Sequence, residues 1–311
     1  MKELSIQKKF HLTGHSGAVY CISKGERSEL IFSGSSDKII TRWNLATEQA
    51  ENFAVQFPSI VYAIYYEASA NLLLAGTSEG AIHIIDLSNK TEKKKLLHHS
   101  APIFDIIYSS IHKIFIAASA DGNISVIDVV TLSLTQKIKL CNEKVRCLDL
   151  NGTQTELAIA CGDGSIRIFD VAEMKEKNNF AAHQFSANAV KFHPDGIHIL
   201  SGGKDAHLNI WGMREGENPI LEMSIPAHNY AIYSIAFHPN NRLFATGSRD
   251  KTIKIWDAET FEFLARINKE NYDGHINSVN KIYWSQYNSI LVSTGDDRAI
   301  IGWEINEENQ L

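Results

Sequence analysis

The chain has 311 residues, a formal net charge of −6 and four cysteines. The negative charge argues against a general nucleic-acid coat and against attraction to anionic membranes. The first ten residues mix charged and isolated apolar side chains without a signal-peptide core, and no apolar run is long enough to cross a bilayer.

The cysteines are expected to be buried thiols. Cys21, Cys141, Cys147 and Cys161 lie in strand-like or strand-end positions, and no two of them have CxxC spacing. This arrangement indicates neither a zinc site nor a disulfide framework. Reduced thiols of this kind suit a reducing compartment, so the expected location is cytoplasmic.

In chain order, short apolar runs separated by turn residues predict β-strands rather than helices. In the first unit, strands are expected over 18–23, 30–34 and 38–45, with an outer strand near 52–56. Turn signals recur at one place of later units. They are Asn151-Gly152, His193-Pro-Asp-Gly196 and His238-Pro-Asn-Asn241.

The same unit occurs seven times. Asp250 stands six residues before Trp256 and twenty-two residues after His228, and these offsets recur along the chain. The corresponding acidic residues are Asp37, Glu79, Asp121, Asp163, Asp205, Asp250 and Asp297; the positions twenty-two residues earlier are His15, Phe57, His99, Cys141, His183, His228 and His275. The first five acidic residues are each 42 apart, and the last intervals are 45 and 47. A fixed period of this size is typical of a repeat architecture.

The repeat predicts an all-β, seven-bladed β-propeller with four-stranded antiparallel blades. A four-stranded sheet cannot bury both faces alone, and radial closure of seven blades covers every face. Seven units fill the chain, so a single domain over 1–311 is expected. Few residues follow Trp303, so the strand near Leu4 to Phe10 is predicted to complete blade 7 and to close the ring.

Four blades contain a complete polar and aromatic tetrad, which resembles a catalytic triad at first sight. Tryptophan donates, aspartate accepts, and hydroxyl and imidazole do both, so the four side chains can form one hydrogen-bonded relay. A site repeated four times at one spacing indicates structure rather than catalysis. The tetrads are His15, Ser33, Asp37 and Trp43; His183, Ser201, Asp205 and Trp211; His228, Thr246, Asp250 and Trp256; and His275, Ser293, Asp297 and Trp303.

These motifs resemble those of the WD-repeat (WD40) family of propellers. The residues that carry the resemblance are Gly14-His15, Gly274-His275, Trp256-Asp257 and the turn from Ser33 to Asp37. The resemblance implies a protein-binding platform without catalytic residues, metal or cofactor. It also implies a monomeric ring that works with other proteins in a multiprotein complex.

Blades 2 to 4 depart from the pattern. Blade 2 has lost the whole tetrad, blade 3 keeps only His99 and Asp121, and blade 4 keeps only Asp163. Because the complete blades 5, 6, 7 and 1 are consecutive in a ring, the weaker blades are consecutive too. We expect faster amide exchange in the weaker blades.

The resemblance also implies where partners bind: three and five residues after each histidine position, and just before each acidic residue. At these positions aromatic side chains gather in blades 1 to 3 and cations in blades 4 to 6, and Tyr272 lies in a longer loop nearby. The predicted contact residues are Tyr20, Tyr62, Phe104, Lys144, Arg146, Lys204, Tyr233, Arg249, Tyr272 and Asp296.

This composition favours a partner segment that is acidic or phosphorylated and has an apolar anchor, with Arg146 and Arg249 as forks for carboxylate or phosphate. Simple packing of the aromatic side chains between blades is the alternative. A nucleic-acid reader would use the same cations and aromatics, although the net charge argues against it. A metal-dependent hydrolase has the least support, because His98 and His99 do not form a metal-ligand pattern with the scattered carboxylates. Lys93, Lys94 and Lys95 are expected on a solvated outer strand.

Overall fold

The computed structural model describes residues 4–214 and 217–307. Contacts between residues divide the chain into two compact units, residues 62–232 and residues 1–61 with 233–311. Their sheets have one design, in which four consecutive strands pair antiparallel with their neighbours. The predicted all-β fold class with seven four-stranded antiparallel blades is confirmed, whereas the single domain over 1–311 stays a prediction.

The unit of residues 62–232 contains blades 2 to 5. The inner and second strands of each blade are largely buried, whereas the outer strands are mostly exposed. Blade 2 is β6 (Val61–Glu67), β7 (Leu72–Thr77), β8 (Ala81–Asp86) and β9 (Thr91–Leu97); blade 3 is β10 (Ile103–Ser109), β11 (Ile114–Ser119), β12 (Asn123–Asp128) and β13 (Ser133–Lys139); blade 4 is β14 (Val145–Leu150), β15 (Glu156–Cys161), β16 (Ser165–Asp170) and β17 (Lys175–Ala181); blade 5 is β18 (Ala187–Phe192), β19 (His198–Gly203), β20 (His207–Gly212) and β21 (Ile220–Pro226).

The second unit contains blades 1, 6 and 7. The strand expected near 52–56 begins three residues earlier, at Gln49. Blade 1 is β2 (Val19–Lys24), β3 (Leu30–Ser35), β4 (Ile39–Asn44) and β5 (Gln49–Gln56); blade 6 is β22 (Ile232–Phe237), β23 (Leu243–Ser248), β24 (Ile253–Asp257) and β25 (Phe263–Ile267); blade 7 is β26 (Val279–Trp284), β27 (Leu291–Gly295), β28 (Ile300–Glu307) and β1 (Leu4–Leu12). The short helix α1 (Lys269–Tyr272) lies between β25 and β26.

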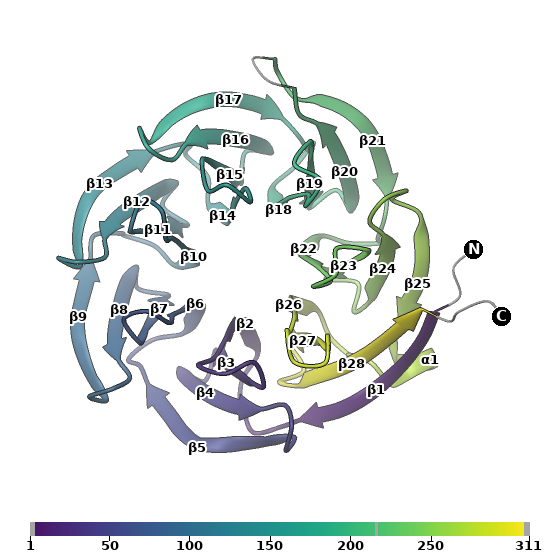
Figure 1. The fold of residues 1–311 in the computed structure, drawn as a ribbon, viewed down its shortest axis with the longest axis horizontal. Helices are drawn as coiled ribbons and strands as arrows, with labels where there is room; N and C mark the ends of the chain where they lie inside the picture. The colour runs from purple at the N-terminus through teal and green to yellow at the C-terminus, as the bar shows by residue number, and fades with distance from the viewer. Residues whose placement is uncertain (1–3, 215–216, 308–311) are drawn as a thin grey trace. The chain divides into compact units, whose positions relative to one another are not determined.

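The N-terminal strand completes blade 7, as the sequence predicts (Figure 1). β1 pairs antiparallel with β28, from Leu4 opposite Glu307 to Leu12 opposite Ile300. Phe10 is buried against Gly302, where a side chain would collide with the phenyl ring. A strand from the start of the chain therefore supplies the outer edge of the last blade.

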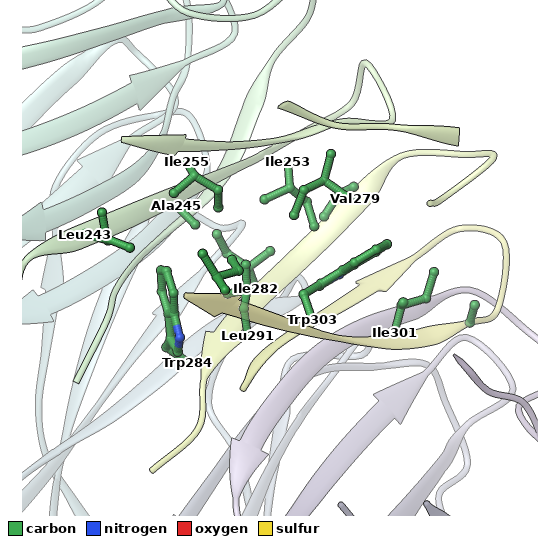
Figure 2. Close-up of a cluster of buried hydrophobic side chains, with 13 residues drawn as sticks. Leu243, Ala245, Ile253, Ile255, Val279, Ile282, Trp284, Leu291, Ile301 and Trp303 are labelled. Carbon is green, nitrogen blue, oxygen red and sulfur yellow. The ribbon is translucent and has the colours of Figure 1, made fainter. Parts of the chain in front are cut away.

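Apolar side chains of adjacent blades fill the space between sheets within each unit. Figure 2 shows one such cluster, in which Ile253 and Ile255 of blade 6 face Ile282 and Trp303 of blade 7. Similar clusters join blades 2 and 3, 3 and 4, and 4 and 5. Among the described residues, no helix has the length and apolar character that a membrane crossing needs.

Side chains on the inner strands also link adjacent blades. A carboxylate oxygen of Asp105 accepts the amide of Leu148 at 3.0 Å, and one of Asp149 accepts the amide of Phe192 at 2.8 Å. In the other unit the hydroxyl of Ser234 accepts the amide of Ile282 at 3.2 Å. These bonds satisfy backbone donors that would otherwise be buried without a partner.

Candidate partner-binding site

The predicted tetrads form in blades 1, 5 and 7. In blade 1, Trp43 Nε1 donates to Ser33 Oγ at 2.7 Å, and Ser33 Oγ lies 2.7 Å from Nε2 of His15. His15 Nδ1 lies 2.8 Å from Asp37 Oδ2. The same bonds occur in blade 5 and in blade 7 at 2.9 to 3.1 Å. In blade 6, Trp256 donates to Thr246 at 2.9 Å. One neutral histidine with its proton on Nδ1 satisfies the whole relay.

The tetrad aspartates also hold the loops that carry the tetrad histidines. Asp37 accepts the amide of Ser16 at 3.0 Å and that of Ile39 at 3.0 Å. Although burial raises it, the hydrogen bond from His183 lowers the pKa of Asp205, and that from His275 lowers the pKa of Asp297. Asp205 and Asp297 are therefore ionised at neutral pH. By accepting amides from two segments of backbone, the tetrad aspartates have a structural role.

Blade 3 keeps only half of this arrangement. His99 Nδ1 lies 2.9 Å from Asp121 Oδ2, but its buried Nε2 has no partner in the part of the chain that the structure describes. Ala117 and Ile127 occupy the places of the tetrad serine and tryptophan. Burial lowers the pKa of His99 even though Asp121 acts in the opposite direction.

A β-bulge in the inner strands sets the direction of the predicted contact residues. The ladder between the first two strands shifts register between Val19 and Cys21, and the residue that it skips is Tyr20. The same shift skips Phe104, Arg146, Asn188 and Asn280 in blades 3, 4, 5 and 7. A bulged residue leaves the regular pleat and its side chain is re-aimed. The predicted contact position five residues after the histidine position thus coincides with a bulge of the backbone in these five blades.

Within residues 62–232 the structure brings several predicted residues together. The rings of Tyr62 and Phe104 meet edge to face with centroids 5.4 Å apart. The guanidinium of Arg146 lies over Phe104, 4.7 Å from the ring centroid, and Arg146 Nε is 3.5 Å from Asn188 Oδ1. Tyr62, Phe104 and Arg146 are only half-buried, so these contacts leave part of each side chain open to solvent.

Two lysines extend this group. Lys144 and Lys204 are exposed, and among the described residues no carboxylate lies within salt-bridge distance of either. The positive charge of Arg146 lowers the pKa of Lys144, burial and Lys204 add to the effect, and Glu143 opposes it. Lys204 Nζ lies 5.9 Å from the ring centroid of Phe185. We call Tyr62, Phe104, Lys144, Arg146, Phe185 and Lys204 the cation–aromatic patch.

Sequence reasoning missed Phe185, whose side chain is 52% exposed, and Tyr230, which is 60% exposed. Each of them stands two residues after a tetrad histidine. The predicted contact positions stand three and five residues after the histidine, so they do not include this one. Exposed aromatic side chains in the loops beside the predicted site add apolar surface for a partner.

The predicted residues in the other unit are arranged differently. Asn280 Nδ2 donates to Asp296 Oδ1 at 2.8 Å and to the carbonyl of Val19 at 3.0 Å, so the acidic residue already has a partner. Tyr272 packs partly against the apolar cluster of blades 6 and 7. Tyr20 and Tyr233 are half-buried and Arg249 is exposed. Their part in binding stays a prediction.

Two groups of side chains have the spacing of metal ligands. Donor atoms of Cys141, Cys161 and Asp163 lie within 4.8 Å of one another, as do those of His193, Asp195 and His198. In the second group, Asp195 Oδ2 lies 2.6 Å from His198 Nδ1, and His193 Nδ1 accepts the amide of Asp195 at 3.1 Å, so these side chains close the turn between β18 and β19. Cys141 is half-exposed, which corrects the expectation of four buried thiols; no disulfide links the four cysteines, all of which lie among the described residues.

The chain belongs to the family described as "WD domain, G-beta repeat". That family matches residues 6–44, 90–128, 133–170, 174–212, 220–257 and 267–304. The match leaves out residues 45–89, which include most of blade 2, where the tetrad is lost. WD40 propellers are generally non-catalytic scaffolds that bind other proteins in complexes.

The chain is also similar to one of the subunits of chromatin assembly factor 1 from Mus musculus. The two are 26% identical over 140 residues, a stretch that covers 43% of this chain and 18% of the mouse protein. The similarity is thus confined to a small part of that longer protein.

Proposed function

We propose that this chain is a non-catalytic interaction scaffold whose cation–aromatic patch binds an acidic or phosphorylated segment that has an apolar anchor. The observation that carries the proposal is the guanidinium of Arg146 stacked on Phe104 beside Lys144 and Lys204. Stacking fixes the plane of the guanidinium and leaves its edge for a bidentate contact with carboxylate or phosphate.

The electrostatics of the patch support an anionic partner. Three cations lie close enough for Arg146 and Lys204 to lower the pKa of Lys144, and Glu143 is the acidic side chain that opposes them. An incoming anion would relieve this repulsion, which a neutral or basic segment could not do. Local charge therefore differs in sign from the net charge of −6.

The aromatic side chains support an apolar anchor within the same segment. Tyr62 and Phe104 present half-exposed rings, and Phe185 adds a further exposed ring beside Lys204. Aromatic and arginine side chains are the residue types that most often dominate binding energy at interfaces. The name of the mouse relative describes one component of an assembly factor, which supports a role among other proteins. The cytoplasmic location and the monomeric state stay predictions.

The test is a binding titration with fluorescently labelled peptides that contain phosphoserine, acidic residues and one leucine, compared with versions lacking the phosphate or the leucine. Arg146→Glu should weaken binding roughly 30-fold, equivalent to ~2 kcal/mol. Tyr62→Ala should weaken mainly the peptides that contain leucine. Lys93→Glu, on the exposed strand β9, changes the net charge equally and should leave affinity unchanged.

The outcome that contradicts the proposal is equal binding by wild type, Arg146→Glu and Tyr62→Ala at unchanged stability. A nucleic-acid reader is the second candidate, because cations and half-exposed aromatics can hold phosphates and stack bases. Oligonucleotide binding with a steep salt dependence, lost in Arg146→Glu, would favour that candidate. Absence of oligonucleotide binding at low salt would exclude it.

A further inference from the structure

Blade 4 has cysteines at two positions where blades 1, 3, 5, 6 and 7 have a histidine and a serine or glycine. Cys141 stands at the tetrad histidine position, twenty-two residues before Asp163. Cys161 stands two residues before Asp163, at the end of β15, where blade 1 has Ser35 and blade 5 has Gly203. The two replacements occur in one blade and face each other.

The backbone brings these two positions to the distance that a bridge requires. Sγ of Cys141 and Sγ of Cys161 lie within 4.8 Å of each other. In blade 5, a Cβ placed on Gly203 would lie 2.5 Å from Cγ of His183, and in blade 7 a Cβ on Gly295 would lie 2.8 Å from Nδ1 of His275. The atoms beyond Cβ at the first position therefore reach Cβ at the second, as a disulfide demands.

The pair also has one accessible and one protected thiol. Cys141 is half-exposed and Cys161 is buried. The neighbouring Cys161 thiol lowers the pKa of Cys141 to about 7, and Cys141 raises the pKa of Cys161; Arg167 also favours the Cys141 thiolate and Asp163 opposes it. In the thiol form, Cys141 Sγ donates to the carbonyl of Glu143 at 3.1 Å. A thiolate is the form that reacts with oxidants and disulfides. Cys141 is thus the attacking thiol and Cys161 the resolving thiol.

We propose that Cys141 and Cys161 form a reversible disulfide when the protein meets a peroxide. The thiolate of Cys141 attacks one oxygen of hydrogen peroxide, the O–O bond breaks, and hydroxide leaves, so that Cys141 becomes a sulfenic acid. The sulfur of Cys161 then attacks the sulfenic sulfur, its proton goes to the departing oxygen, and water leaves as the S–S bond forms. In total, two thiols are oxidised and one peroxide is reduced to two waters.

The bridge would act on the cation–aromatic patch. The loop from Cys141 to Lys144 is held beside the end of β15, because the amide of Gly162 donates to the carbonyl of Lys144 at 2.7 Å. Closing the S–S bond draws residues 141–144 toward the end of β15 and moves Lys144 relative to Arg146. On this point, which rests on the proposed function, we expect the oxidised protein to bind the acidic peptide several-fold more weakly.

The test treats the full chain with substoichiometric to excess hydrogen peroxide, blocks remaining thiols, and maps peptides by mass spectrometry before and after a dithiol reductant. The expected result is one linked peptide pair that contains Cys141 and Cys161 and disappears on reduction. Cys147→Ala, which removes a buried thiol of the same blade, should leave the link intact. Cys161→Gly, which restores the residue of blades 5 and 7, should leave Cys141 as a trapped sulfenic acid.

Failure of the linked peptide to form, at peroxide levels that oxidise Cys141 in Cys161→Gly, would overturn the proposal. A cobalt(II) titration giving an intense thiolate charge-transfer band in wild type, with the link suppressed by zinc, would also overturn it in favour of a metal site. The peptide map needs no binding partner, so loss of the proposed function leaves this test unaffected. A link that forms without changing peptide affinity would overturn only the effect on the patch.

Discussion

Blades 1 and 3 differ in how far the polar relay extends, and the comparison separates two roles of the tetrad. In blade 1 the relay runs from Trp43 through Ser33 and His15 to Asp37, so each buried group has a partner. In blade 3 the bond between His99 and Asp121 persists, but Nε2 of His99 has no hydrogen-bond partner among the described residues. Closing the turn therefore does not require the bonds that tie the second strand to the third.

The largest expected effect tests whether a complete tetrad can hold a blade that lacks its outer strand. Deleting residues 1–10 removes most of β1 and the buried Phe10 from blade 7, whose tetrad is complete. The loss of the phenyl group alone is worth ~3–5 kcal/mol, so the melting temperature should fall by about 10 °C. Calorimetry measures the shift, and Lys9→Ala, at an exposed residue of β1, should change it little. An unchanged melt would contradict the role of β1.

The next effect breaks the relay where it is complete. Ser293→Ala removes the hydroxyl that lies 2.9 Å from both Trp303 Nε1 and His275 Nε2. Two buried groups then lose their partner, and the free energy of unfolding should fall by ~1–3 kcal/mol. Urea denaturation of blade 7 variants measures the change. Gln286→Ala, at an exposed residue of the same blade, serves as control, and equal midpoints for the two variants would refute the structural role of the tetrad.

The reverse substitution should repair blade 3. Ala117→Ser places a hydroxyl where Ser33 stands in blade 1, within reach of the unpartnered Nε2 of His99. One new buried hydrogen bond should add ~1 kcal/mol to the free energy of unfolding. Ala118→Ser adds a hydroxyl to the next buried residue, which packs in the apolar cluster on the opposite face of the strand, and should destabilise. If both substitutions destabilise equally, the missing partner is not what weakens this blade.

The smallest expected effect is the loss of stability of blade 3 at acid pH. Burial, with help from His99, lowers the pKa of His98 to about 4, and burial also lowers the pKa of His99. The unfolded segment thus binds more protons than the folded one below pH ~6.5, so stability falls as the pH drops from that value toward 4. Amide exchange in blade 3 should accelerate over this range. In blades 5 and 7, the ionised Asp205 and Asp297 lose their contribution only at lower pH.

The histidine variants sharpen this prediction. His98→Gln removes the titrating group and should shift the acid-induced exchange of blade 3 to lower pH, whereas His112→Gln, in the turn between β10 and β11, should leave it in place. Uniform exchange across all blades between pH 4 and 7 would contradict both this prediction and the expected weakness of blades 2 to 4.

The sequence was sufficient for the blade count and for the tetrads of blades 1, 5 and 7, because both depend on local patterns repeated at one period. The N-terminal strand follows from the local alternation of its apolar residues. The 42-residue spacing of Asp37 to Asp205 aligns every turn, and an unpaired alternating segment ahead of His15 can only serve as a strand elsewhere. Turn chemistry such as His193-Pro-Asp-Gly196 is equally local, and Gly196 donates to the carbonyl of His193 as expected.

The contacts between blades could not be predicted from the sequence. That Arg146 stacks on Phe104, or that Asp105 accepts the amide of Leu148, depends on the angle between neighbouring sheets. No pattern along the chain encodes that angle. The exposure of Phe185 and Cys141 likewise depends on how the loops of adjacent strands cover one another. The one signal of Phe185 in the sequence is its place two residues after the tetrad histidine His183.

The register shift at Tyr20, Phe104, Arg146, Asn188 and Asn280 has a practical consequence. Because the ladder skips these residues, the pairing of the sheet makes little demand on which side chain stands there. A gene library that varies these five codons together should yield mostly foldable proteins with altered partner preferences. The binding preference of such a platform can therefore be changed without redesign of the scaffold beneath.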